Sequence, residues 1–412
     1  METAESATAL ASIVKDQRTG LIATLVRRYG FDLAEESVDA AIEAALEQWP
    51  SEGIPASPRA WLLSVSRRRA IDRVRHRITA DAVHADLRVL APDEAAAPDE
   101  PDTVELPDDR LRLLFTCCHP AIAADARVAL SLRWLSGLST EDVARAFCIP
   151  VATMAQRLTR AKTKIEAARI PYEVPERSEL DERLGSVLEV VYAIFNEGYV
   201  ATTGTELQRV DLAEEAIRLA ELVDLLLPER ADVMAMLALM LLVHARRDAR
   251  VASDGELVPL DEQDRSKWDR AAITRAQAYL RLALAAGPPG AYAIEAAIQA
   301  LHDESKSFEA TDFRQIVALY AMLRERSDAP IVRLNEVVAR SMVDGPEAAL
   351  IDLLALDAVE ELRGHPGPAA AKADLYRRLG RTAEACAAYD EAIAATKNEV
   401  EKRFLARRRD AL

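Results

Sequence analysis

Hydrophobic residues recur at helical intervals along most of the chain, which predicts an all-α protein. In the most informative stretch, Met154, Leu158, Ala161 and Ile165 fall at positions i, i+4, i+7 and i+11, the spacing of a single buried helix face. The N-terminal segment has the same period and no alternating pattern of useful strand length. We therefore expect a fold built from helices joined by turns.

The residues around this helix predict a helix-turn-helix. Ser139 and Asp142 have the spacing of a capping box, so a first helix can start there and run to about Phe147. Pro150 stands just ahead of the second helix, where its missing N–H does no harm. The second helix carries, on its outer face, the residues that could enter a major groove: Thr153, Gln156, Arg157, Arg160 and Lys164. By itself this pattern also fits an amphipathic surface helix with solvated charges.

A second basic helix is predicted earlier in the chain. The segment Trp49–Pro58 is rich in proline and predicts a loop, and the segment Arg59–Arg77 holds seven arginines against the single acid Asp72. Basic residues next to an aromatic suit single-stranded DNA, whose bases stack and whose phosphates need neutralising. The candidates for this contact are Arg59, Trp61, Arg68, Arg69, Arg73 and Arg75. Because tryptophan is largely buried in folded domains, packing is the favoured role for Trp61.

Before this loop lies a predicted helix with an acidic face. Asp32 and Glu35 again have capping-box spacing, which places the helix start near Asp32. Its buried stripe is predicted by residues at helical intervals: Val38, Ile42, Ala45 and Trp49. Outside the stripe lie the acids of the exposed face: Glu35, Glu36, Asp39 and Glu43.

The balance of charge limits how the chain can meet nucleic acid. The 412 residues, enough for two or three domains, carry a net charge of −16, which argues against coating DNA through bulk electrostatics. Any DNA contact must come from local basic surfaces. Residues 1–176 hold 22 basic and 27 acidic residues, which leaves −11 for the remainder. Residues 91–109 carry eight acids, four prolines and no base, the composition of a disordered linker.

Neither a metal site nor an enzyme active site is expected. Cys117, Cys118, Cys148 and Cys386 show no Cys-x-x-Cys spacing, and adjacent cysteines cannot readily chelate one ion with both thiolates. The sequence holds no glycine-rich phosphate loop and no nucleophile beside a placed base, so we expect no enzyme and no cofactor. Free cysteines, no signal peptide and no apolar run of membrane length predict a cytoplasmic protein.

The C-terminal half predicts helical hairpins arranged as an α-solenoid. The stretch Tyr376–Ile393 is similar to the core of a tetratricopeptide repeat, in which small residues let two helices pack closely. Gly345–Leu350 and, less clearly, Glu215–Ile217 with Pro228 look like degraded copies of the same turn. Such a stack presents a concave surface for a peptide or protein partner. The acids of residues 260–269 suit a helix start better than catalysis, since no histidine or metal-like spacing accompanies them.

The N-terminal motifs resemble, in order and spacing, the extracytoplasmic-function (ECF) sigma factors of bacterial RNA polymerase. The run Asp32–Val38, the pair Trp49-Pro50 and the runs Ser57–Leu63 and Arg69–Arg75 are similar to the second conserved region of that family. The segment Leu106–Ile165 is similar to its fourth region. The rest of the chain resembles, more loosely, the group of these factors that carries a long C-terminal helical extension.

The resemblance implies a sigma factor that binds core RNA polymerase and directs promoter recognition and transcription initiation. It implies four parts: residues 1–78 as region 2, residues 79–106 as an acidic linker, residues 107–176 as the region 4 helix-turn-helix, and residues 177–412 as a helical domain that controls activity. Catalysis would stay in the polymerase.

The resemblance also implies roles for particular residues. The acids expected to dock on the clamp of the largest polymerase subunit are Asp32, Glu35, Glu36 and Asp39, with the flap of the second-largest subunit as a further partner. The arginine-rich helix would capture the melted promoter element nearest the start site, and the helix-turn-helix would read the more distant element. Many relatives have lysine at the position of Ala155, so their promoter sequence does not carry over. The alternative is a helix-turn-helix regulator with a solenoid sensor that is not a polymerase subunit.

Overall fold

The computed structural model describes residues 2–84, 107–147, 149–201, 205–356 and 359–412. Within these ranges the fold is all-α, as expected, and the single β-type contact is an isolated bridge between Val251 and Leu257. The chain divides into two compact units, Met1–Val190 and Val191–Leu412. The division falls inside one helix, α7 (Leu180–Tyr199), rather than near residue 177. No described helix is both long enough and apolar enough to cross a membrane.

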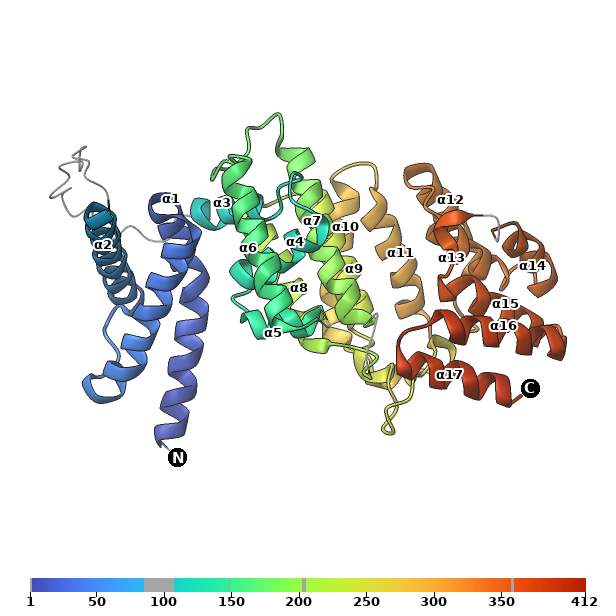
Figure 1. The fold of residues 1–412 in the computed structure, drawn as a ribbon. Helices are drawn as coiled ribbons and strands as arrows, with labels where there is room; N and C mark the ends of the chain where they lie inside the picture. The colour runs from blue at the N-terminus through green and yellow to red at the C-terminus, as the bar shows by residue number, and fades with distance from the viewer. Residues whose placement is uncertain (1, 85–106, 148, 202–204, 357–358) are drawn as a thin grey trace. The chain divides into compact units, whose positions relative to one another are not determined.

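The first unit contains six helices before α7 in its described part. They are α1 (Glu2–Glu52), α2 (Pro58–His84), α3 (Pro107–Cys117), α4 (Ala124–Leu130), α5 (Thr140–Ala146) and α6 (Val151–Ala167), with a π-helical turn at Ser131–Leu135 after α4 (Figure 1). Helix α1 packs along α2 and also against α3. Residues 79–84, which were expected in the linker, continue α2, and residues 85–106 lie outside the described part of the chain.

One boundary in the first unit agrees with the sequence-based expectation and one differs from it. Helix α1 is broken at Gly30, whose φ of 74° suits glycine, so a new helix begins within two residues of Asp32. Pro50 lies inside the last turn of α1 rather than in a loop, and the loop is shortened to Gly53–Ser57. A proline there removes one hydrogen bond at a helix end, which costs less than in a helix interior.

The expected regions 2 and 4 share a core within the first unit. The ring of Phe31 in α1 stacks on Trp134 with centroids 4.1 Å apart. The Tyr172 hydroxyl donates to the Ala23 carbonyl over 2.7 Å, and the Thr19 hydroxyl donates to the Leu135 carbonyl over 3.3 Å. Residues expected in two domains therefore pack as one body.

The second unit follows α7 with ten further helices in its described ranges. They are α8 (Val210–Leu226), α9 (Ala231–His244), α10 (Arg270–Ala285), α11 (Ala291–Glu304), α12 (Phe313–Arg326), α13 (Pro330–Arg340), α14 (Pro346–Ala355), α15 (Pro366–Arg378), α16 (Thr382–Ala395) and α17 (Glu399–Asp410). Each packs against the next along the chain, and α15, α16 and α17 lie side by side in red in Figure 1. Helix α9 is buried all round from Val233 to His244, which accounts for its continuous apolar sequence.

The hairpin of α15 and α16 lies where the sequence predicts close helix packing. Gly380, with a φ of 70°, forms the turn between them. Its interface is built mainly from small buried residues: Ala369, Ala373, Ala385, Ala388 and Ala392. These small residues let the two backbones approach, as the alanine pattern indicates, and Tyr389 of α16 is buried in the same cluster.

Candidate nucleic-acid interface

The helix-turn-helix begins with the predicted capping box. The Ser139 hydroxyl accepts from the Asp142 backbone N–H over 3.0 Å, and the Asp142 carboxylate accepts from the Ser139 N–H over 3.3 Å. Hydrogen bonds from Ser139, with a smaller contribution from Arg145, lower the pKa of Asp142 below its usual range. Pro150 occupies the position before α6, so both helix starts agree with the sequence prediction.

Helix α6 has one buried face and one exposed face, as its periodicity predicts. Met154, Leu158, Ala161 and Ile165 are buried. The side chains exposed to solvent are Thr153, Gln156, Arg160 and Lys164. Arg157 differs from these four, because it lies over the Phe147 ring at 5.1 Å and 3.6 Å from the Asp125 carboxylate. Four of the five predicted reading residues are thus presented to solvent and the fifth is held against the protein.

The arginine-rich helix α2 packs on α1 through a different face from its arginines. Its buried residues are Leu62, Leu63, Ser66 and Ala70. Arg68 and Arg69 are exposed, while Arg73 forms an ion pair with Glu36 and Arg59 donates to the Gln17 side chain over 3.5 Å. Arg75 is also exposed. Arg68 and Arg69 thus lie exposed in the middle of α2, whereas Arg59 and Arg73 contact side chains of α1.

Trp61 is half-buried and meets Trp49 edge to face, with ring centroids 5.3 Å apart. This contact agrees with the packing role that we favoured for it. Edge-to-face aromatic pairs add about 0.5–1.5 kcal/mol beyond the area they bury. Its partner Trp49 is buried and belongs to the predicted stripe of α1.

All four acids of the predicted polymerase-binding face form ion pairs inside the first unit. Glu35 is the most enclosed, with Arg18 at 3.4 Å and an ion pair to Arg133. Arg18 also binds Asp39 at 2.8 Å. Asp32 pairs with Lys162 of α6, and Glu36 pairs with Arg73 of α2. Burial and the nearby Arg18 lower the pKa of Arg133, against the opposite pull of Glu35.

These pairings are the part of the site that sequence reasoning missed. Lys162 lies 130 residues from Asp32 along the chain, and such a separation leaves no signal in helical periodicity. Lys162 lies on a different face of α6 from the exposed Arg160. Only the fold brings it to the acidic face of α1.

The cysteines of α3 are buried packing residues. Burial raises the pKa of Cys117, and it raises that of Cys118 to about 11, so both remain thiols at neutral pH. Burial also lowers the pKa of the neighbouring His119. Cys386 is half-buried on α16, and Cys148 lies outside the described residues. Among the described residues no group of three potential metal ligands comes together.

The fold defines an all-α protein of two compact units, with the consecutive helices α5 and α6 in the first and the helices α8 to α17 in the second. Residues 183–284 match a family of unknown function, DUF6596. The chain is 42% identical over 383 residues to "Uncharacterized protein R00370" of Rhizobium meliloti (strain 1021), covering 92% of this chain and 90% of that protein. The chain therefore belongs to the family of this relative, which shares both units. No solved structure matches the chain.

Proposed function

We propose that this chain is a sigma factor that binds core RNA polymerase, directs promoter recognition and initiates transcription in the cytoplasm. The observation that carries the proposal is the pair of basic helices in one unit. Helix α6 exposes Arg160 and Lys164, and α2 exposes Arg68 and Arg69. A protein of net charge −16 has little other means of holding DNA.

Each basic helix has a distinct task in this proposal. Thr153, Gln156, Arg160 and Lys164 read base edges and phosphates of the distant promoter element in the major groove. Arg157 joins them when it leaves the Phe147 ring. The arginines of α2 neutralise the phosphates of the melted strand nearest the start site, where bases can stack on aromatic side chains.

The acidic face of α1 is the proposed contact with the clamp of the largest polymerase subunit. A negative patch suits a basic partner and steers encounter. Because Asp32 and Glu36 are about half exposed, with side-chain exposures of 60% and 49%, they can exchange their present partners for polymerase residues. Glu35 is 15% exposed, and we assign it to holding α1 against the π-helical turn at Ser131–Leu135.

The second unit is the proposed control domain, a solenoid of the tetratricopeptide type. Its α15–α16 hairpin, with a glycine turn and an alanine interface, supports that class. A solenoid offers a surface for a partner or a ligand, and control from the same chain would replace a separate regulatory protein.

One observation favours the alternative, a helix-turn-helix regulator that does not join polymerase. The ion pairs of Asp32, Glu35, Glu36 and Asp39 within the first unit give these acids a structural role without any polymerase. The alternative gives no role to the exposed arginines of α2, and for that reason we rank it second.

Transcription in vitro separates the two functions. Purified full-length chain is mixed with core polymerase and a template that carries the DNA upstream of its own gene. A sigma factor co-elutes with core polymerase and yields transcripts with a specific start. Alone, it binds duplex DNA only weakly, because a small number of net positive charges does not hold a duplex at physiological salt. Tight, salt-resistant binding of the free chain, with no polymerase-dependent start, would establish the alternative.

A further inference from the structure

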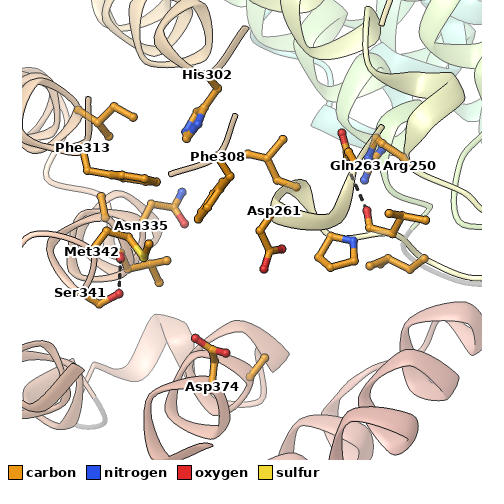
Figure 2. A pocket seen from close by; sticks show the side chains of 18 of the residues that line it. Arg250, Asp261, Gln263, His302, Phe308, Phe313, Asn335, Ser341, Met342 and Asp374 are labelled. Carbon is orange, nitrogen blue, oxygen red and sulfur yellow. Dashed lines mark hydrogen bonds between the residues drawn. The ribbon is translucent and has the colours of Figure 1, made fainter. Parts of the chain in front are cut away.

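The second unit contains a half-open cavity of about 720 Å³. Figure 2 shows Asn335, Ser341 and Met342 on one side, Arg250 and Gln263 on the opposite side, and Asp374 of α15 below. Ligand pockets in proteins typically measure about 300–1,000 Å³. The cavity therefore has the size of a small-molecule site.

The row of helices closes on itself around this cavity. Asn398, buried at the start of α17, donates through its side-chain amide to the carbonyls of Ala201 and Glu206, each over 2.9 Å. Arg403 and Arg407 of α17 bind Glu256 at 2.9 and 3.0 Å. An extended peptide needs an open groove, whereas a ring closed by its last helix favours a compact ligand.

The charged residues that line the cavity are mostly cations. Five arginines line it, Arg246, Arg250, Arg377, Arg378 and Arg408, against two aspartates, Asp261 and Asp374. Asp374 is already engaged, because Arg377 donates to it over 2.6 Å. His302 adds no charge near neutral pH, since burial lowers its pKa to about 4. Arg377 is paired through its contact with Asp374, and Arg408 pairs with Glu262 outside the lining, so the lining holds more cations than anions although several of them are already paired.

Two of these arginines are buried with incomplete pairing. Arg246 is 4% exposed, and its Nε atom has no hydrogen-bond partner among the described residues. Arg246 donates to the Gln299 side-chain oxygen, and the Asp303 carboxylate lies 3.8 Å from its Nε as an ion pair without a hydrogen bond. Arg250 lies 3.5 Å over the Tyr199 ring and donates to the Tyr199 carbonyl, and no carboxylate among the described residues forms an ion pair with it. Burying a cation without a close anion is costly, so an anionic ligand would complete the pairing of Arg250 and share Arg246 with Asp303.

The rest of the wall combines polar side chains with an apolar group. Phe308 and Phe313 face the cavity in Figure 2, and Val338 and Met342 reach into it while 45% and 41% exposed. Exposed apolar side chains in a concave site are available to cover the apolar body of a ligand.

We propose that this cavity binds a small organic anion, with its charged group at Arg246 and Arg250 and its apolar body against Phe308, Val338 and Met342. The proposal goes beyond the function in transcription and does not rest on it, because ligand binding is measured without polymerase or DNA. A negative result for ligand binding therefore does not affect the proposed function in transcription, and a negative result for transcription does not affect the proposed ligand site.

The test uses two dyes that differ by one sulfonate group. 8-Anilinonaphthalene-1-sulfonate carries a sulfonate on an aromatic body, and N-phenyl-1-naphthylamine is its neutral counterpart. Fluorescence titration of the full-length chain is expected to show a single saturable site. Its affinity for the sulfonate dye should be about tenfold higher than for the neutral dye, because one charge-assisted hydrogen bond contributes a free energy of that size. Equal affinity for the neutral dye would overturn the anion assignment.

Two variants and a matched control locate the site. Val338→Trp fills the cavity from an exposed position and is expected to weaken dye binding at least about tenfold, since the ligand's apolar body loses its place. Leu284→Trp, at a 44% exposed position of α10 outside the cavity, leaves binding unchanged. Unchanged binding to Val338→Trp would place the dye elsewhere and refute the proposal.

Arg250→Gln tests the charged end, with circular dichroism to verify its fold. The preference for the sulfonate is expected to disappear while the neutral dye binds as before. If Arg250→Gln retains the preference, the charged group is not held there and the assignment fails. Displacement of the dye by micromolar hexaglutamate would assign the cavity to acidic peptides and overturn the small-ligand proposal.

Discussion

At the scale of single residues, Gly198 has the tightest surroundings among the described glycines. A Cβ atom there would lie 2.8 Å from the Cα of Ala213 and closer still to its backbone nitrogen. The Arg209 N–H also donates to the Gly198 carbonyl over 2.8 Å. We predict that Gly198→Ala destabilises the second unit by about 1–3 kcal/mol, because two backbones must separate. Calorimetry would show a lower melting temperature.

Gly185 gives the matched control, because it lies in the same helix with open space around its Cα. Alanine is a better helix former than glycine by about 1 kcal/mol. Gly185→Ala is therefore expected to raise the melting temperature. An increase for Gly198→Ala as well would mean that α7 and α8 can move apart without cost.

His302 makes the stability of the second unit depend on pH. Burial, with Arg246 and Arg265 nearby, lowers its pKa from 6.5 to about 4. Between these values the unfolded chain binds more protons than the folded one, so stability is lost as the pH falls from 6.5 towards 4. His302→Phe keeps the aromatic contact with Phe313 and removes the imidazole that binds the proton. We predict a flatter profile for the variant, with melting temperatures recorded by circular dichroism.

The neighbouring Asp303 acts in the opposite direction. Burial raises its pKa to about 6, so its contribution to stability is present at low pH and is lost as the pH rises through 6. Asp303 remains in both proteins, and the difference between the His302→Phe and wild-type profiles isolates the histidine. Identical slopes between pH 4 and 6.5 would contradict the low pKa of His302.

At the scale of elements, local patterns predicted helices well where local contacts decide them. The Ser139 capping box and the buried face of α6 depend on residues within a few turns, and both are confirmed. The helix start predicted near Asp32 lies within two residues of the break of α1 at Gly30. The carboxylates of Asp32 and Glu35, whose spacing predicted that start, form ion pairs with Lys162 and Arg133, and these tertiary contacts left no signal in the local sequence.

Helix α6 also gives a prediction that rests on the proposed function. A bidentate contact from an arginine to a guanine edge contributes about 1–3 kcal/mol of discrimination. Arg160→Ala is therefore expected to lower specific initiation in vitro by about tenfold or more and to relax the preference at one base pair. Transcript yield on a set of single-base promoter variants measures both effects.

Arg326→Ala is the control for this change. Arg326 is an exposed arginine in the last turn of α12, in the second unit, so its removal alters net charge equally without touching α6. Equal losses from both variants would show that total charge, rather than a contact of α6, sets the transcript yield.

At the scale of the whole molecule, the contacts that define each unit join residues far apart in the sequence. The stacking of Phe31 on Trp134 makes one body of the expected regions 2 and 4. The amide of Asn398 reaches Ala201, 197 residues earlier, and closes the second unit. Helical periodicity records which face is buried, not what covers it. For this reason the sequence predicted the helices but neither the shared core nor the cavity.

The ion pair between Lys162 and Asp32 then becomes a competitor of the proposed polymerase contact. An acid that binds the clamp must leave the lysine of α6, so the pair opposes docking of the free chain. Exposed pairs are worth about 0.2–1 kcal/mol, and Lys162→Ala is expected to tighten binding to core polymerase by about two- to fivefold. Affinity is measured by fluorescence anisotropy with labelled full-length chain and no DNA.

A double-mutant cycle decides whether the pair itself is responsible. Asp32→Ala should weaken binding, and adding Lys162→Ala to it should change nothing further, because the lysine has lost its partner. Lys164→Ala removes the same charge from the exposed face of α6 and should leave affinity for polymerase unchanged. Weaker binding by Lys162→Ala would show instead that the lysine supports the docking surface, and the acidic face of α1 would then act only as part of a closed first unit.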